Sequence, residues 1–160
     1  MNEQQVGKVL SIAVRTKING PMREMSEAVA QANAGLEGDV PVDPQRGVTF
    51  LAQQQWEQVT RELGADLPWH TRRANLLVDC PSLGELIGKT IRVGGVEIVI
   101  NGETDPCSIM DLQHPGLREI LIPDMRGGVY GRVIRGGAIK RGEMINIVAE
   151  SPTAWEGSAE

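Results

Sequence analysis

Residues 91–100 read Ile91-Arg92-Val93-Gly94-Gly95-Val96-Glu97-Ile98-Val99-Ile100. Apolar and polar side chains alternate on both sides of the glycine pair, which is the pattern of half-buried strands. Glycine tolerates the positive φ that a two-residue hairpin turn demands. The stretch therefore predicts two antiparallel strands joined at Gly94-Gly95, and with them a fold built on β-structure.

Similar apolar patterns predict further short strands outside this hairpin. They cover 6–15, 48–51, 71–78, 128–135 and 144–148, with strand or loop over 22–40 and a connection over 136–142. Only 3% of residues are aromatic, whereas 19 glycines are available for tight turns. Closing a sheet on itself disposes of exposed strand edges. We therefore expect a mostly β fold with short α insertions, a closed or nearly closed β-barrel, with a β-sandwich as the alternative.

One segment has a clear helical pattern. In 53–63, Trp56, Val59 and Leu63 recur at helical spacing, and Gly64 follows at the position where helices often end in a left-handed residue. The sequence predicts an α-helix that packs on the barrel through these three side chains.

Two shorter helices are predicted as well. Ser82 and Glu85 have the spacing of a capping box ahead of a short helix that ends at Gly88. The segment 116–122 has room for a turn or two of helix before Pro123.

Length and composition restrict the class of protein. The 160 residues, 41% of them hydrophobic, fit one domain over 1–150 followed by a flexible tail at 151–160. A net charge of −5 argues against a nucleic-acid partner, because phosphate backbones are bound by clustered Lys and Arg. The sequence contains no apolar run long enough to cross a bilayer and no signal segment, so we expect a cytoplasmic protein with no membrane partner.

Cys107 is the candidate reactive residue. It follows Pro106 in a polar loop after the 96–100 strand, where a thiol is expected to be accessible. A thiolate is both a nucleophile and a soft metal ligand. Asp105 and Asp111 would raise its pKa, so a cationic neighbour is needed. The structural alternative is that Cys107, like Cys80 before Pro81, is a small buried side chain.

The other candidates favour structural roles. Asp39 is expected to cap a turn or to accept hydrogen bonds from backbone amides. His70 and His114 do not form a zinc pattern with Cys107. The sequence contains no Ser-His-Asp order, phosphate-binding loop or dinucleotide fingerprint.

Four segments in order along the chain carry a resemblance to a known family: Gly35-Leu36-Glu37-Gly38-Asp39, Arg72-Arg73-Ala74-Asn75-Leu76, Asp105-Pro106-Cys107-Ser108-Ile109-Met110 and Gly136-Gly137-Ala138-Ile139-Lys140-Arg141-Gly142-Glu143. Together they resemble the MOSC domain, named for the C-terminal part of molybdenum cofactor sulfurase, over about 6–148. The last segment ends in Gly-Glu where Gly-Asp is usual, which keeps the charge.

The resemblance implies a β-barrel that binds a molybdopterin-type molybdenum cofactor. In that case Cys107 is the molybdenum ligand or the carrier of persulfide sulfur. Arg73, Asn75 and Lys17 would hold the phosphate and the pterin edge. The structural alternative makes Arg73 a surface arginine at the mouth of a strand and Lys17 a solvated turn residue.

Three functions remain open from the sequence. The first is cofactor binding or sulfur relay through Cys107, with a cysteine desulfurase as a possible partner. The second is a molybdenum-dependent reductase of N-hydroxylated compounds, which would need a separate electron-donor protein. The third is a non-catalytic protein-interaction module. Substrate, oligomeric state and the question of whether the chain is an enzyme at all lie beyond the sequence.

Overall fold

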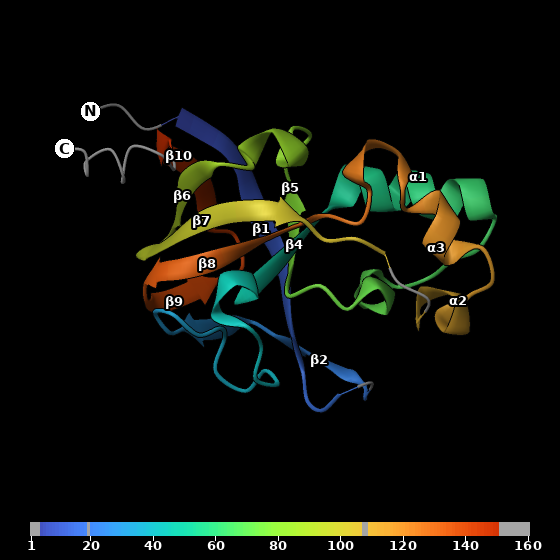
Figure 1. The fold of residues 1–160 in the computed structure, drawn as a ribbon, viewed down its shortest axis with the longest axis horizontal. Helices are drawn as coiled ribbons and strands as arrows, with labels where there is room; N and C mark the ends of the chain where they lie inside the picture. Colours follow the sequence, from blue (N-terminus) through green and yellow to red (C-terminus); the bar gives the residue numbers. More distant parts are fainter. Residues whose placement is uncertain (1–3, 19, 107–108, 151–160) are drawn as a thin grey trace.

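A barrel of seven strands forms one end of the molecule, and short helices gather at the other (Figure 1). The computed structural model describes residues 4–18, 20–106 and 109–150. Within these residues the barrel strands are β1 (Gln4–Arg15), β4 (Val48–Ala52), β5 (Leu76–Asp79), β6 (Lys89–Val93), β7 (Val96–Glu103), β8 (Val129–Arg135) and β10 (Met144–Glu150). Their order is β10-β6-β7-β8-β4-β5-β1, and pairing of β1 with β10 closes the ring. The predicted closed barrel is confirmed.

The long strand β1 links three parts of the sheet. It pairs first with β10, then with β5, and finally with β2 (Met22–Met25), which extends the sheet beyond the barrel. The neighbours β4 and β5 are parallel, whereas the other pairs are antiparallel. A separate two-stranded sheet joins β3 (Glu27–Ala30) to β9 (Gly137–Lys140).

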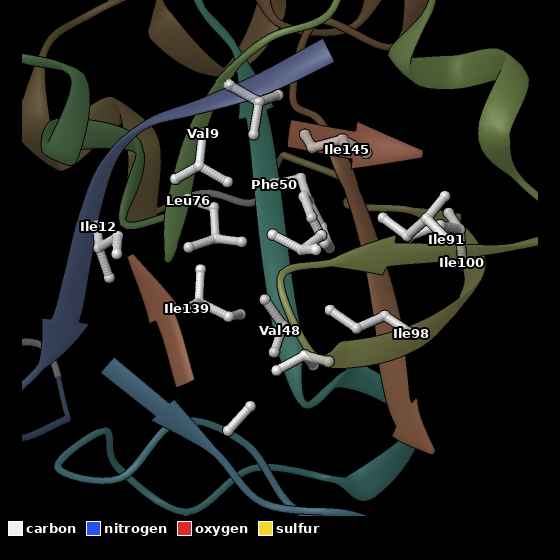
Figure 2. Close-up of a cluster of buried hydrophobic side chains, with 14 of the residues drawn as sticks. Val9, Ile12, Val48, Phe50, Leu76, Ile91, Ile98, Ile100, Ile139 and Ile145 are labelled. Atoms are coloured by element: carbon white, nitrogen blue, oxygen red, sulfur yellow. The ribbon is translucent and has the colours of Figure 1, made fainter. Parts of the chain in front are cut away.

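Alternating residues of the strands fill the barrel (Figure 2). Phe50, Leu76 and Ile98 are fully buried there. Burial of such a side chain contributes about 1.5–3 kcal/mol relative to exposure. Leu51 and Leu77, one position away from these core residues, belong to a second apolar cluster that the helices cover. The two strands β4 and β5 therefore separate two cores, since successive side chains of a strand point to opposite faces.

The second core holds the helices to the outside of the barrel. The helices are α1 (Gln53–Leu63), α2 (Ile109–Gln113) and α3 (Leu117–Ile120), and the 3₁₀ turns are η1 (Pro44–Arg46), η2 (Trp69–Arg72), η3 (Leu83–Leu86) and η4 (Pro123–Met125). Helix α1 covers the predicted residues, buries Trp56 and Val59, and ends at Gly64 with φ 67°. The predicted helix and its left-handed end are confirmed, as is the hairpin of β6 and β7.

Two local predictions are wrong. The strand expected over 71–78 begins only at Leu76, because Arg73 adopts a left-handed conformation with φ 67° after η2. The expected connection over 136–142 contains strand β9. The loop predicted around Cys107 falls outside the described residues, and a short helix that the sequence did not predict, α2, begins at Ile109.

The capping box at Ser82 is also absent. Ser82 makes no side-chain hydrogen bond to the amides of η3. The short helix itself forms as the 3₁₀ turn η3, and Gly88 follows it with φ 90°.

In the part of the chain that the structure describes, no helix combines the length and the apolar character needed to span a membrane.

Candidate functional site

A cavity of about 400 Å³ opens between the barrel and the helices. Four arginines line it: Arg15, Arg46, Arg72 and Arg73. The other lining residues are Val42, Asp43, Thr49, Ala74, Thr104, Asp105, Met110 and Gly127. With two aspartates among these residues, the wall carries a net positive charge in a chain whose overall charge is −5. The arrangement suits an anion, because a cleft lined by one sign of charge attracts the opposite sign.

Arg15 at the end of β1 is paired with a buried carboxylate. Its Nη2 lies 2.6 Å from Oδ2 of Asp39, and its Nε lies 3.0 Å from Oδ1. The backbone amide of Arg15 donates to the same carboxylate at 2.7 Å. The side chain of Asp39 is 1% exposed. The predicted bond from a backbone amide to Asp39 is confirmed, and its carboxylate also orients an arginine of the cavity.

Asn75 is buried directly behind this pair. Its Oδ1 accepts from the amide of Thr49 at 3.0 Å, and its Nδ2 donates to the carbonyl of Ala13 and to Asp39, both at 3.2 Å. Asn75 thus ties β1, β4 and the loop of Asp39 together with its whole amide group. The residue is fully buried and does not line the cavity, so its contact with a cofactor stays a prediction.

Arg72 forms the buried back wall. Its Nε donates to the carbonyl of Gly127 at 3.1 Å, and its Nη2 donates to the carbonyl of Thr104 at 2.9 Å. Its Nη1 lies 3.7 Å from the sulfur of Met110. Arg72 therefore holds three separate segments together and contributes its charge to the cavity from behind.

Arg73 bridges the cavity and the turn after β1. Its guanidinium donates to the carbonyl of Gly20 and, at 3.4 Å, to that of Lys17. Burial, and next the positive charge of Arg15, lowers the pKa of Arg73, while the carboxylate of Asp39 opposes this. Lys17 is brought close to Arg73 through its backbone, but its own side chain is exposed and is not part of the cavity wall.

Arg46 at the end of η1 is held differently. The centre of its guanidinium lies 4.6 Å from the ring centre of Tyr130 on β8. An arginine held over an aromatic ring keeps N–H groups that can still donate to other partners. Sequence reasoning missed this residue, because Asp43-Pro44-Gln45-Arg46-Gly47 predicts only a turn.

Cys107 itself lies outside the described residues. Its neighbours on either side, Asp105 and Met110, both line the cavity. Thr104 lies on the same wall, and within the described residues its buried hydroxyl has no hydrogen-bond partner. Described residues on both sides of Cys107 in the sequence therefore line the arginine cavity.

Metal-binding clusters of the usual kind are absent from the described part of the chain, which contains no group of three His, Cys, Asp or Glu side chains suited to an ion. Nε2 of His70 lies 3.7 Å from the carboxylate of Glu24, whereas Nδ1 of His114 lies 2.9 Å from the carbonyl of Pro115. Cys80 is buried, and burial raises the pKa of its thiol. Its predicted packing role is confirmed.

The sequence pattern of the MOSC domain matches residues 37–146. The chain belongs to the MOSC domain family. Three of the four segments that carried the resemblance lie wholly within this match, and Asp39 of the first segment lies within it as well. No curated protein matches the chain in sequence.

Solved structures share the MOSC fold of this chain. The YUAD protein from Bacillus subtilis superimposes with a TM-score of 0.74 at 16% identity, over 92% of this chain and 99% of that one. YiiM from Escherichia coli gives a TM-score of 0.69 at 16% identity, over 93% and 76%. YiiM from Geobacillus stearothermophilus gives 0.66 at 13% identity, over 97% and 83%. These likenesses establish the fold.

Proposed function

We propose that this MOSC chain binds an anionic molybdopterin-type molybdenum cofactor in the arginine cavity, and that Cys107 is its metal ligand or relays sulfur to it. The observation that carries the proposal is the convergence of four arginines on one cavity at the two ends of the Cys107 segment. The clustered guanidinium groups repel one another, and a bound anion would stabilise this local positive charge in an otherwise acidic chain.

The residues present fit such a group. A phosphate needs several N–H donors, and arginine supplies five in a planar fork. Arg46 and Arg73 would hold the anionic end, while Arg15 and Arg72 add charge from positions set by Asp39 and by three backbone and side-chain acceptors. When bound, the cofactor supplies a redox-active molybdenum centre.

Cys107 needs its thiolate for either role, and the guanidinium charges are the cationic neighbours that Asp105 makes necessary. In the sulfur-relay case, the Cys107 thiolate attacks the outer sulfur of a persulfide on a cysteine desulfurase. A new S–S bond forms on Cys107, and the desulfurase cysteine leaves as its thiolate. The proposed partner is a cysteine desulfurase, or an electron-donor protein in the reductase case. We also propose that the protein acts in the cytoplasm.

The test is elemental analysis with a visible spectrum of protein made in a host that synthesises the cofactor, for the parent and for Cys107→Ala. Cofactor binding predicts molybdenum and pterin in the parent and a lower molybdenum content in the variant. Sulfur relay predicts a mass increase of one sulfur atom after incubation with a desulfurase, in the parent only. A parent that takes up neither metal nor sulfur would reject the proposal and favour the protein-interaction module.

A further inference from the structure

Arg46 differs from the other three cavity arginines in its bonding. Arg15 is committed to Asp39, and Arg73 is bonded to the carbonyls of the turn after β1. Arg72 donates to the carbonyls of Gly127 and Thr104. Across the described residues, the guanidinium of Arg46 makes no hydrogen bond or ion pair, and its contact is the stack on Tyr130. Of the four guanidinium groups, that of Arg46 is therefore the one with no protein acceptor in the described part of the chain.

Residues far away in the sequence hold Arg46 in place. Nδ2 of Asn101 donates to the backbone carbonyl of Gln45 at 2.9 Å and to its side-chain Oε1 at 3.1 Å. These bonds fasten η1 to β7, one residue before Arg46. The side chain of Asp43 also accepts from the amide of Gln45 at 2.8 Å and caps the turn.

The next residue of β7 makes room for the stacking partner. At Gly102, a Cβ would lie 2.9 Å from the hydroxyl oxygen of Tyr130 and 3.1 Å from Cζ. Real Cβ atoms avoid such distances, so a side chain at this position would require the end of the Tyr130 ring to shift. Asn101 thus holds the backbone of η1, and its neighbour Gly102 leaves space for the ring over which Arg46 lies.

We propose that Tyr130, seated on Gly102, is a positioning residue that orients Arg46 as the oxyanion-binding arm of the cavity, and that the group bound is a phosphate. The guanidinium that lies over the ring has N–H groups that make no other bond among the described residues, and such groups match two oxygens of a phosphate. The charges of Arg72 and Arg73 on the same wall favour a dianion over a carboxylate. The inference shares the cavity of the proposed function, but it does not depend on molybdenum.

The experiment is calorimetric titration of the full chain, made in a host without the cofactor, with inorganic phosphate. Pyrophosphate serves as a second probe and acetate as the monoanionic control. We expect phosphate to bind and acetate to bind at least about tenfold more weakly. Arg46→Gln should weaken phosphate binding by about tenfold or more, as expected when a charge-assisted pair is lost. Lys140→Gln removes the same charge from an exposed site on β9 and should leave binding within about twofold.

Tyr130 is tested through its ring. Tyr130→Phe should keep phosphate affinity within about twofold, whereas Tyr130→Leu should lose about fivefold, because an aliphatic side chain offers no π face. In the Arg46→Gln background, Tyr130→Leu should have no further effect, since coupled residues are not additive. Gly102→Ala should resemble Tyr130→Leu. Urea unfolding of each variant identifies any that fail to fold.

Three results would overturn the inference: no phosphate binding by the folded parent, an Arg46→Gln variant that binds like the parent, or additive losses from Arg46→Gln and Tyr130→Leu. The proposed function is judged separately by molybdenum and sulfur content. Phosphate binding through Arg46 without either element would reject the cofactor and keep the oxyanion arm.

Discussion

The carboxylate of Asp39 shows how one buried residue orients an arginine of the cavity. Buried charges are stable only when they are paired and hydrogen-bonded. Asp39 meets this condition with the amide and guanidinium of Arg15 and the amide group of Asn75. Because Asn75 also bonds to Thr49, the network connects the loop after β3 to both β1 and β4.

We expect Asp39→Asn to lower the free energy of unfolding by about 3 kcal/mol, because it leaves Arg15 beside a neutral amide in a partly buried site. Urea unfolding measures the change. Glu27→Gln, at an exposed position on β3, removes the same charge and should change stability by less than about 0.5 kcal/mol. Equal effects of the two variants would show that the network contributes nothing specific.

The two thiols should differ in reactivity. Cys80 is fully buried, and burial raises the pKa of its thiol, which keeps it protonated and unreactive at neutral pH. We predict that iodoacetamide labels Cys107 in the native protein much faster than Cys80, as read by peptide mass. In Cys107→Ala the remaining thiol should react only after unfolding. Rapid native labelling of that variant would contradict the assignment of Cys80 to the core.

At the scale of elements, one ion pair joins helix α1 to the segment that ends at the cavity. Nη1 of Arg126 lies 2.9 Å from Oε1 of Glu62 and 3.1 Å from the carbonyl of Ile120. The next residue, Gly127, accepts the bond from Arg72 in the cavity wall. The hydrogen bond from Arg126 lowers the pKa of Glu62.

This pair predicts a pH dependence. Since the pKa of Glu62 is lower in the folded chain than in the unfolded one, the ionised carboxylate stabilises the fold. Its contribution is complete above the ordinary glutamate value of about 4.3 and disappears as the pH falls through the lowered value. Glu62→Gln should therefore be less stable than the parent in urea at pH 7, and the difference should shrink as the pH falls below the ordinary glutamate value. Glu57→Gln on the same helix is the control, and a difference for Glu62→Gln that persists in acid would refute this origin.

Elements with strong local signals could be predicted from the sequence. The hairpin at Gly94-Gly95 and helix α1 depend on periodicity and turn residues that are close together in the chain. Strand β9 could not be predicted in the same way, because it begins with the second glycine of Gly136-Gly137 and is extended only by pairing with β3. The strand expected from Thr71 failed for a similar reason, since the left-handed Arg73 is held by a turn more than fifty residues away.

The candidate site was predictable only in part. The resemblance drew attention to Cys107 and Arg73, and Arg73 lines the cavity. The position of Arg46 could not be predicted, because it depends on Tyr130 of β8 and on Asn101 and Gly102 of β7. Short-range patterns do not reveal which distant strands meet.

For the whole molecule, closure of the barrel depends on the last strand. β10 pairs with β1 on one side and with β6 on the other, and these neighbours are far apart in the sequence (Figure 1). Ile145 of β10 also belongs to the buried interior. Without β10, two strands would expose unpaired backbone groups, and the core would open to water at that seam.

Two truncations test this dependence. A chain ending at Glu143 lacks β10, and we expect it to lose cooperative unfolding in urea, because an open sheet with an exposed core seam cannot offset the entropy of ordering the chain. A chain ending at Glu150 lacks only the segment predicted to be a tail, 151–160, and should unfold within about 0.5 kcal/mol of the parent. Loss of the fold in the chain that ends at Glu150 would place residues of 151–160 in the domain. A cooperative transition in the chain that ends at Glu143 would show that the barrel is stable without its closing strand.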